Sequence, residues 1–157
     1  MILIIDDVIT QDQCTNTINK FSLHPEWIER CPIMRHEALD VTDKFSSDVE
    51  IQNIVVSITQ KVHFHFGKDY LYEWGKLVKW DEGRWQAYHL DVTSSKTRLT
   101  SITYLNEEFA NGCTIFADGT KVKPLMGRTL IFDGNQYYHG VEPVMSGTRY
   151  ALAIWYE

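Results

Sequence analysis

Two histidines and one aspartate are the residues in this chain whose types and spacing best suit metal chemistry. His89 and Asp91 form its single H-x-D, and His139 follows fifty residues after His89. In an extended strand, side chains two residues apart point to the same face, so His89 and Asp91 can hold one ion together. By itself, the H-x-D would also suit a surface histidine beside an aspartate. With His139 as a third donor, the pattern indicates a metal site with open coordination positions.

The open positions decide which chemistry such a site supports. Two imidazoles and one carboxylate are the facial triad of non-haem Fe(II) oxygenases. A 2-oxo acid can occupy two free positions through its keto oxygen and C1 carboxylate, and dioxygen can take the third. The distant C5 carboxylate of 2-oxoglutarate then needs a cation, and a planar guanidinium can donate two parallel hydrogen bonds to it. Arg149, ten residues after His139, is placed to supply that cation.

His63 and His65 are a rival pair of candidate ligands. They lie at the end of an expected helix, in which their rings would diverge by about 200° and could not share an ion. Trp85 and Tyr88 flank the H-x-D and are candidates for a substrate channel or for ordinary aromatic packing. Cys113 is expected to be a small core residue rather than a redox thiol.

The segment up to about residue 66 is expected to be largely helical. Residues 2–5 can form a short strand, and Thr10 with Gln13 predicts a capping box that opens a helix. That helix should end near Pro25, because proline disfavours helical geometry in the residue before it.

Ser47 and Glu50 predict a second capping box that opens another helix. Apolar residues then recur at three- and four-residue steps, and this stripe should lie on a sheet. The stripe consists of Ile51, Ile54, Val55, Ile58 and Val62. Residues 31–46, between the helices, show no convincing periodicity and are predicted to be a long solvated loop, a candidate lid over a pocket. That loop contains Arg35 and His36.

From residue 67 onward, short β-type runs alternate with glycine-containing turn signals. The candidate strands are 70–80, 85–90, 98–105, 113–116, 120–123, 128–133, 137–142 and 148–156. Eight short strands at such spacing suggest a sandwich or jelly roll rather than a parallel sheet. No domain boundary is evident. Residues 1–157 are therefore expected to form a single domain, with 67–157 as its core and 1–66 as helical support and lid.

The composition indicates the class of protein and argues against some kinds of binding partner. The 157 residues are 44% hydrophobic and 23% charged, as expected for one soluble globular domain. A net charge of −6 repels phosphate backbones, so nucleic acid is a poor partner. Cys14, Cys31 and Cys113 form no C-x-x-C, and neither a signal peptide nor a membrane-spanning run is evident. These features predict a cytoplasmic protein without a membrane partner; they indicate no oligomeric state.

The segment from about Lys76 to Tyr156 resembles the 2-oxoglutarate- and Fe(II)-dependent dioxygenases, specifically their prolyl 4-hydroxylase-like branch. Several motifs carry this resemblance in the family's order. They are Val78-Lys-Trp80 through His89-Leu-Asp91, Leu99-Thr-Ser-Ile-Thr-Tyr104-Leu-Asn106, Asn111-Gly-Cys-Thr114-Ile-Phe116, Val122-Lys-Pro124, Gly127-Arg-Thr-Leu-Ile-Phe132, and His139-Gly140 followed by Pro143-Val144, Gly147 and Arg149. So many elements in one order make a chance match implausible.

The resemblance implies a fold and a set of ligands. The fold is a double-stranded β-helix, a jelly roll in which N-terminal helices buttress one sheet. His89, Asp91 and His139 would bind iron, and Arg149 and Tyr104 would hold the C5 carboxylate of 2-oxoglutarate. Fe(II), 2-oxoglutarate and O2 are therefore the expected cofactors, with ascorbate as a further candidate.

The chain departs from the family's pattern at four positions. Arg149 stands where lysine is frequent, and its guanidinium can do the same electrostatic work. Trp80 stands where tyrosine is common, so that tyrosine's hydrogen bond is in doubt. Asn111 and Cys113 replace the glycine and the acidic residue of a frequent G-G-E-T version. The wall on the substrate side is therefore expected to differ.

The implied reaction is hydroxylation of a substrate C–H bond, with 2-oxoglutarate converted to succinate and CO2. The resemblance favours a prolyl residue in a peptide or protein, and a free amino acid or other small molecule is the alternative. Two hypotheses of other kinds stay open: a metal-containing jelly-roll binding module without turnover, and a cupin-like metalloenzyme that uses no 2-oxo acid. The latter would have no need of a cation such as Arg149.

Overall fold

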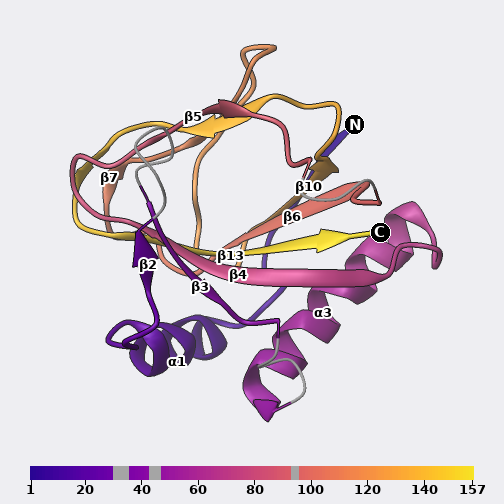
Figure 1. Ribbon diagram of the computed structural model, residues 1–157, viewed down its shortest axis with the longest axis horizontal. Helices are drawn as coiled ribbons and strands as arrows, with labels where there is room; N and C mark the ends of the chain where they lie inside the picture. The colour runs from indigo at the N-terminus through magenta and orange to yellow at the C-terminus, as the bar shows by residue number, and fades with distance from the viewer. Residues whose placement is uncertain (30–35, 43–46, 93–95) are drawn as a thin grey trace.

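The computed structural model describes residues 1–29, 36–42, 47–92 and 96–157. Within them the chain forms helices α1 and α3 and thirteen strands (Figure 1). The strands are β1 (Ile2–Ile5), β2 (Ile28–Glu29), β3 (Glu37–Asp40), β4 (Tyr72–Trp80), β5 (Gln86–His89), β6 (Leu99–Tyr104), β7 (Ala110–Asn111), β8 (Thr114–Phe116), β9 (Lys121–Val122), β10 (Thr129–Asp133), β11 (His139–Val141), β12 (Val144–Ser146) and β13 (Arg149–Tyr156). Neither helix combines the length and apolarity needed to cross a membrane.

Helix α1 (Gln11–Phe21) begins at the predicted capping box. The Thr10 hydroxyl accepts the backbone N–H of Gln13 at 3.1 Å, and the Gln13 side chain accepts the backbone N–H of Thr10 at 2.9 Å. The helix ends at Ser22, its C-cap, before Pro25 is reached. Both ends of this helix therefore lie close to the positions predicted from the sequence.

Helix α3 (Val49–Phe66) differs from the prediction at its first turn. Its N-cap is Asp48 rather than Ser47, and the Asp48 carboxylate accepts the N–H groups of Glu50 and Ile51 at 3.0 and 3.1 Å. An aspartate satisfies these free N–H groups as well as a serine does, and its charge also suits the positive end of the helix dipole. All five residues of the predicted apolar stripe are buried.

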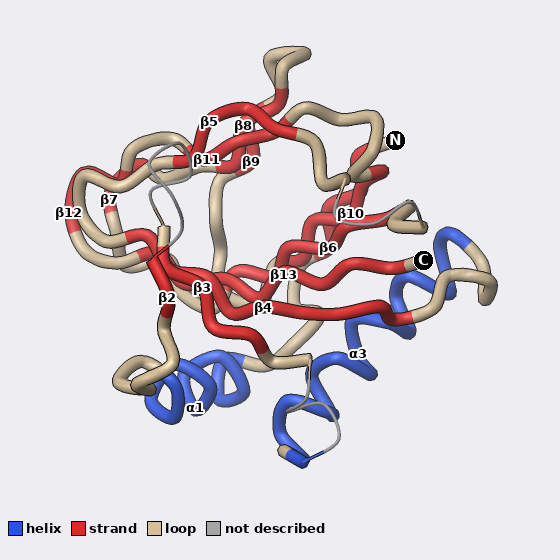
Figure 2. The backbone as a smooth tube through the Cα atoms, viewed as in Figure 1, coloured by secondary structure: helices blue, strands red, loops and turns tan. Residues whose placement is uncertain are grey.

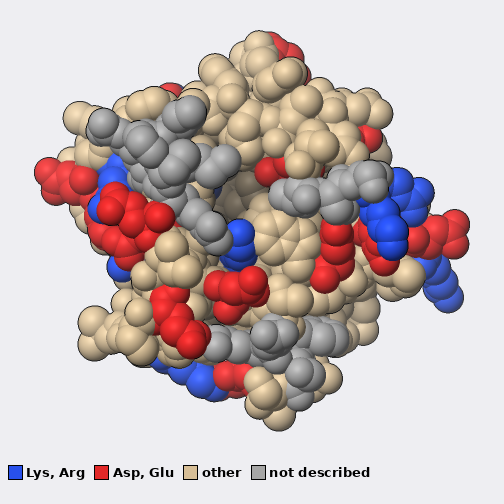
Figure 3. Space-filling model, viewed as in Figure 1, with Lys and Arg blue, Asp and Glu red and all other residues tan. Residues whose placement is uncertain are grey.

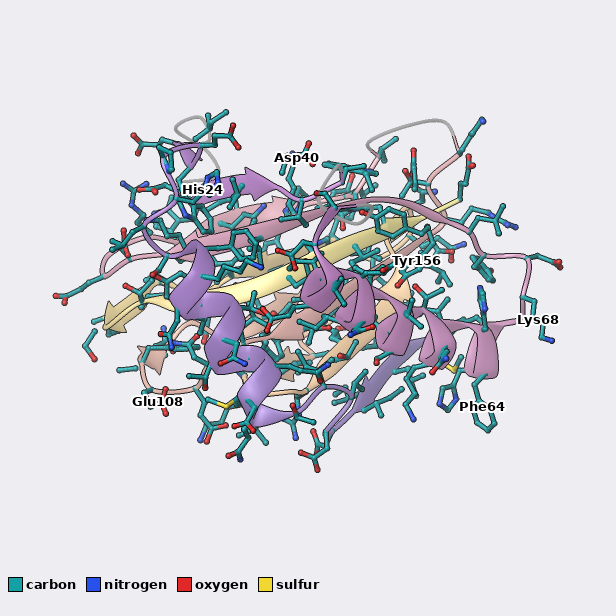
Figure 4. All side chains as sticks on the ribbon, turned by 90° about the horizontal axis from the view of Figure 1, so that it is seen from below. His24, Asp40, Phe64, Lys68, Glu108 and Tyr156 are labelled. Atoms are coloured by element: carbon teal, nitrogen blue, oxygen red, sulfur yellow. The ribbon has the colours of Figure 1, made fainter. Side chains whose placement is uncertain are left out.

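Seven strands form the larger sheet, in the order β1-β10-β6-β13-β4-β3-β2. The strand pairs are antiparallel throughout, and β13 lies at the centre between β6 and β4. Helices α1 and α3 lie across the outer face of this sheet (Figure 4). The stripe of α3 and the outward residues of the central strands, such as Leu77, Leu152 and Ile154, share one apolar core.

A smaller four-stranded sheet, in the order β5-β11-β8-β9, faces the inner side of the larger sheet (Figure 2). A second apolar core lies between the two layers and includes Val78, Leu130 and Phe132. This arrangement is the expected jelly roll. The eight strands predicted from residue 70 onward are all present, with bounds that differ by at most two residues. The short pair β7 and β12 was not predicted.

Strand β3 corrects the prediction of a loop over residues 31–46. It pairs with β4 from Glu37, opposite Lys79, to Asp40, opposite Lys76. Four residues are too few for a β periodicity to be recognised in the sequence. Residues 31–35 and 43–46 of the predicted lid lie outside the described residues.

Candidate metal and cosubstrate site

The three predicted metal ligands meet at one place between the two sheets. His89 ends β5 and His139 begins β11, and the two residues are directly paired in the register. Nε2 of His89 lies 3.4 Å from Oδ1 of Asp91, and Nε2 of His139 lies 3.5 Å from Oδ2. One donor atom from each residue falls within 4.8 Å of the others. Strand pairing thus unites ligands that are fifty residues apart in sequence.

Hydrogen bonds to the backbone fix both imidazoles. Nδ1 of His89 donates to the carbonyl of Ala87 at 3.0 Å, and Nδ1 of His139 donates to the carbonyl of Tyr137 at 3.1 Å. Because a carbonyl can only accept, each ring carries a proton on Nδ1, and in its neutral form Nε2 keeps a lone pair that can bind a metal ion.

The carboxylate of Asp91 is fixed from the opposite side. The Thr100 hydroxyl, on β6 of the larger sheet, donates to Oδ2 of Asp91 at 2.8 Å. A Cβ at Gly134 would lie 2.4 Å from that hydroxyl oxygen and 2.9 Å from Cβ of Asp91. The closeness of the backbone therefore requires glycine at position 134. Thr100 was not predicted to be a site residue, although it lies on the same face of the strand as Tyr104.

The pKa values of the three residues show that the carboxylate of the site is ionised, as the binding of a cation requires. Burial by itself would raise the pKa of Asp91, but the hydrogen bond with His89 and the neighbouring imidazoles hold it below its usual value. Burial lowers the pKa of His139. Burial acts in the same direction on His89, but its hydrogen bond with Asp91 and that carboxylate's charge raise its pKa overall. The site therefore offers an ionised carboxylate between two imidazoles.

Arg149, at the start of β13, is fully buried. Its guanidinium lies 4.1 Å from the centre of the Trp80 ring and donates from NH2 to the Thr114 hydroxyl at 3.1 Å. Its Nε and NH1 are buried without a hydrogen-bond partner, and no ion pair joins Arg149 to a carboxylate among the described residues. Burial lowers the pKa of this group. A buried cation with free N–H groups is costly unless an anion binds beside it.

Tyr104 is brought to the same point by β6. Its ring centre lies 5.3 Å from the Arg149 guanidinium, and its hydroxyl lies 2.7 Å from the Thr114 hydroxyl. Burial raises the pKa of Tyr104, so the phenol is neutral. Thr114 thus links the two residues predicted to hold a carboxylate. It lies in a motif quoted from the sequence, but no role was assigned to it.

One cavity of about 290 Å³ joins the triad to Arg149. Its lining includes His89, Asp91, His139, Arg149 and Trp80, together with the inward residues of β4 and β13. It opens as a hollow near the centre of the face seen in Figure 3, with basic side-chain atoms at its edge. A metal ion at the triad and an anion at Arg149 would therefore occupy the same space.

Residues 75–157 match the family model described as the 2OG-Fe(II) oxygenase superfamily. The matched segment is just over half of the chain, and it contains the triad, Tyr104, Thr114 and Arg149. The chain belongs to the 2OG-Fe(II) oxygenase superfamily. The cofactors of this oxygenase are accordingly Fe(II) and 2-oxoglutarate.

Curated relatives agree with this family over a limited segment. The 2-oxoglutarate and iron-dependent oxygenase domain-containing protein 3 of Rattus norvegicus is 36% identical to the chain over 77 residues, and so is that of Mus musculus. These alignments cover 45% of this chain and 24% of each relative. The chain thus spans about a quarter of the length of those proteins.

Solved structures share the fold of this oxygenase. A prolyl hydroxylase from Trichoplax adhaerens, in complex with a hypoxia-inducible factor peptide, has a TM-score of 0.83 at 14% identity, over 99% of this chain and 82% of that one. A Pseudomonas putida prolyl-4-hydroxylase has a TM-score of 0.75 at 16% identity, over 99% and 91%. A viral collagen prolyl hydroxylase from Paramecium bursaria Chlorella virus-1 has a TM-score of 0.72 at 21% identity, over 99% and 94%.

Of the other candidate residues, His36 lines the cavity of this oxygenase, whereas Tyr88, His63 and His65 do not. The prediction that His36 lies in a solvated loop is wrong. His36 is buried and lines the cavity, and its ring packs against Trp80 with 5.2 Å between the ring centres. Tyr88 is half exposed on the opposite side of β5 from His89. His63 and His65 lie on α3, where His63 bonds to the carbonyl of Tyr70.

Cys113 is a partly buried free thiol, whose pKa is raised by burial and by the charge of Glu142. A raised pKa leaves the thiol protonated, and a thiol is less reactive than a thiolate. Arg35 lies outside the described residues.

Proposed function

We propose that this chain is an Fe(II)- and 2-oxoglutarate-dependent hydroxylase with His89, Asp91 and His139 as its iron ligands. The donor set fits Fe(II), since two imidazoles and one carboxylate leave room for cosubstrate and dioxygen. When bound, the iron centre with its cosubstrate supplies the oxidative chemistry, which yields succinate and CO2 and adds a hydroxyl group to a substrate C–H bond. The protein supplies binding, orientation and shielding.

The observation that carries this proposal is the buried, unpaired guanidinium of Arg149 in the cavity of the triad. In its proposed role its NH1 group, which has no hydrogen-bond partner, donates to the C5 carboxylate of 2-oxoglutarate. A cupin-like metalloenzyme without a 2-oxo acid would leave this cation without a partner, at a considerable cost in stability.

Neighbouring residues orient the cosubstrate in this proposal. The Thr114 hydroxyl holds NH2 of Arg149, and Tyr104 can turn its hydroxyl from Thr114 to the bound carboxylate. Trp80 covers one face of the guanidinium and keeps water from it. The apolar wall of Val78, Ile102 and Val141 shields the space between the anion and the metal.

The proposed substrate is a prolyl residue in a peptide or protein. The fold is shared with several prolyl hydroxylases, one of which was solved with a peptide. A free amino acid is the alternative, because the residues that support the proposal surround the metal and cosubstrate rather than the target.

A direct test incubates the purified protein with Fe(II), 2-oxoglutarate and either a proline-containing peptide library or a mixture of free amino acids. We expect succinate, together with the gain of one oxygen atom on a prolyl peptide by mass spectrometry. Succinate formation should vanish in His139→Ala and persist in His65→Ala, a matched control on α3. Metal binding without succinate in any mixture would instead favour a binding module, and half the activity in His139→Ala would exclude His139 as a ligand.

A further inference from the structure

A stacked pair of indoles forms the end of the cavity away from Arg149. Trp74 of β4 is paired in the register with Trp155 of β13, and their rings lie 4.1 Å apart at an angle of 15°. Both residues line the cavity. The indole N–H of Trp155 is buried without a hydrogen-bond partner. This end of the cavity therefore offers flat apolar surface, with the unpaired N–H of Trp155 buried in its wall.

A second cation of the cavity wall lies beside the indole pair. Lys76 is two residues after Trp74 and on the same face of β4, and its ammonium group lies 4.4 Å from the centre of the Trp74 ring. Its neighbour on β13 is the small residue Ala153, which also lines the cavity. On its other side, β3 places Asp40 opposite Lys76, and the Asp40 carboxylate accepts the N–H of Thr42 at 2.8 Å.

The cosubstrate has no need of Lys76. Arg149 is paired with Trp80, four residues along β4 from Lys76, a separation of roughly 13 Å at strand spacing. Only three carbon atoms separate the two carboxylates of 2-oxoglutarate, so a molecule held at Arg149 and the triad does not extend that far.

The metal end of the cavity is next to the indole pair. Trp155 is directly opposite Thr100 in the register of β13 and β6, and Thr100 is the residue that holds Asp91. A substrate carbon presented to a metal at the triad would therefore have Trp155, Trp74 and Lys76 beside it.

We infer, on the basis of the proposed function, that Lys76, Trp74 and Trp155 form a subsite for a carboxylate of the substrate next to the carbon that is hydroxylated. The ammonium group of Lys76 supplies the counter-charge, the Trp155 N–H supplies a hydrogen bond, and the indoles cover the adjoining apolar atoms. The carboxylate belongs either to an acidic side chain beside the target residue or to a free amino acid.

Because the chain has a negative net charge, a preference for acidic substrates is a meaningful test of this subsite. A chain of net charge −6 repels acidic substrates in general. A preference for them must therefore come from a local cation, and exchanging that cation should remove it.

The test measures binding rather than turnover. Protein loaded with Mn(II) and N-oxalylglycine is titrated with blocked Asp-Pro-Gly, Asn-Pro-Gly and Lys-Pro-Gly peptides, and separately with free L-proline and L-prolinamide, while tryptophan fluorescence is followed. We expect the acid member of at least one set to bind about tenfold more tightly than its amide. Lys76→Met should abolish that difference, and Lys76→Glu should favour the lysine peptide.

Lys79→Met is the matched control. Lys79 lies on the same strand but on the opposite face, where it pairs with Glu37 at 2.8 Å, and its loss should leave the acid preference intact. Equal binding of acids and amides, no binding of any carboxylate, or an unchanged preference in Lys76→Met would overturn the inference. A Lys76-dependent preference without any oxygen gain in the turnover assay would refute the proposed hydroxylation and leave the subsite standing.

Discussion

The guanidinium of Arg149 lies against the indole of Trp80, with 4.1 Å between its central carbon and the ring centre. The two residues are paired across β13 and β4, so the register of the sheet sets this contact. The indole covers one face of the cation without neutralising it. Arg149 is thus held in place by an aromatic ring and by Thr114, while its Nε and NH1 groups have no hydrogen-bond partner among the described residues.

Arg149→Ala should raise the 2-oxoglutarate concentration needed for half-maximal succinate formation at least about tenfold, since hydrogen bonds to a charged group contribute about 1.5–3 kcal/mol. Arg149→Lys should show a smaller rise, because it keeps the charge but loses the fork. Arg98→Met is the control: Arg98 also stacks on an aromatic ring, that of Tyr70, but is exposed. An unchanged requirement in Arg149→Ala would show that the anion binds elsewhere.

Thr114→Val should weaken 2-oxoglutarate binding and lower the free energy of unfolding. The substitution keeps the shape but leaves NH2 of Arg149 and the hydroxyl of Tyr104 without their shared partner, at a cost of about 1–3 kcal/mol for a buried group. Tyr104→Phe should cost less, because Arg149 keeps its hydrogen bond to the Thr114 hydroxyl. Urea unfolding with and without 2-oxoglutarate measures both effects, and equal stability of Thr114→Val and wild type would contradict this role.

Thr100→Val should reduce the affinity for Mn(II) or Fe(II) by about tenfold or more, the usual effect of losing a hydrogen bond that orients a metal ligand. The reason is that Asp91 loses its bond from the Thr100 hydroxyl. Thr103→Val provides the control on the same strand, since Thr103 faces the other side and bonds to Thr129 at 2.8 Å. Isothermal titration with Mn(II) should separate the two variants; equal affinities would argue against Thr100 as the residue that orients Asp91.

Cys14 should make the fold sensitive to alkaline pH. Burial raises the pKa of its thiol from the ordinary 9.0 to about 11. The folded state therefore favours the neutral thiol, and this contribution is complete below pH 9.0 and is lost as pH rises towards about 11. Urea unfolding over this range should show a smaller decline in Cys14→Ala than in wild type, whereas parallel profiles would assign the decline to other groups.

Much of the fold could be predicted because its strands are short and each is bounded by a turn. The capping box of Thr10 and the apolar stripe of α3 could also be recognised in the sequence. Strand β3 was missed because four residues carry too little pattern, and its place in the sheet depends on pairing with β4 rather than on its own propensity. The cap at Asp48 was missed because its neighbour Ser47 is an equally good capping residue.

The part of the site that could be predicted consists of residues in recognisable sequence motifs. His89, Asp91 and His139 were predicted as metal ligands from residue type and spacing, and the structure brings their donor atoms together. Arg149 was predicted from the charge that a dicarboxylate requires, and it lines the same cavity. Thr100 gave no such signal, because a strand threonine resembles any other until its neighbours are known. The same holds for His36 and for the stacked pair Trp74 and Trp155, whose proximity is a property of strand register alone.

The central position of β13 in the larger sheet bears on how the protein is made. Residues 149–156 pair with β4 on one side and β6 on the other, although both of those strands precede them by more than forty residues. A nascent chain on the ribosome therefore cannot close this sheet until that segment has been translated. Until then, the facing edges of β4 and β6 lack their partner and can pair wrongly with other chains. The same late segment delivers Arg149 and Trp155, so during synthesis the pocket cannot exist before the sheet does.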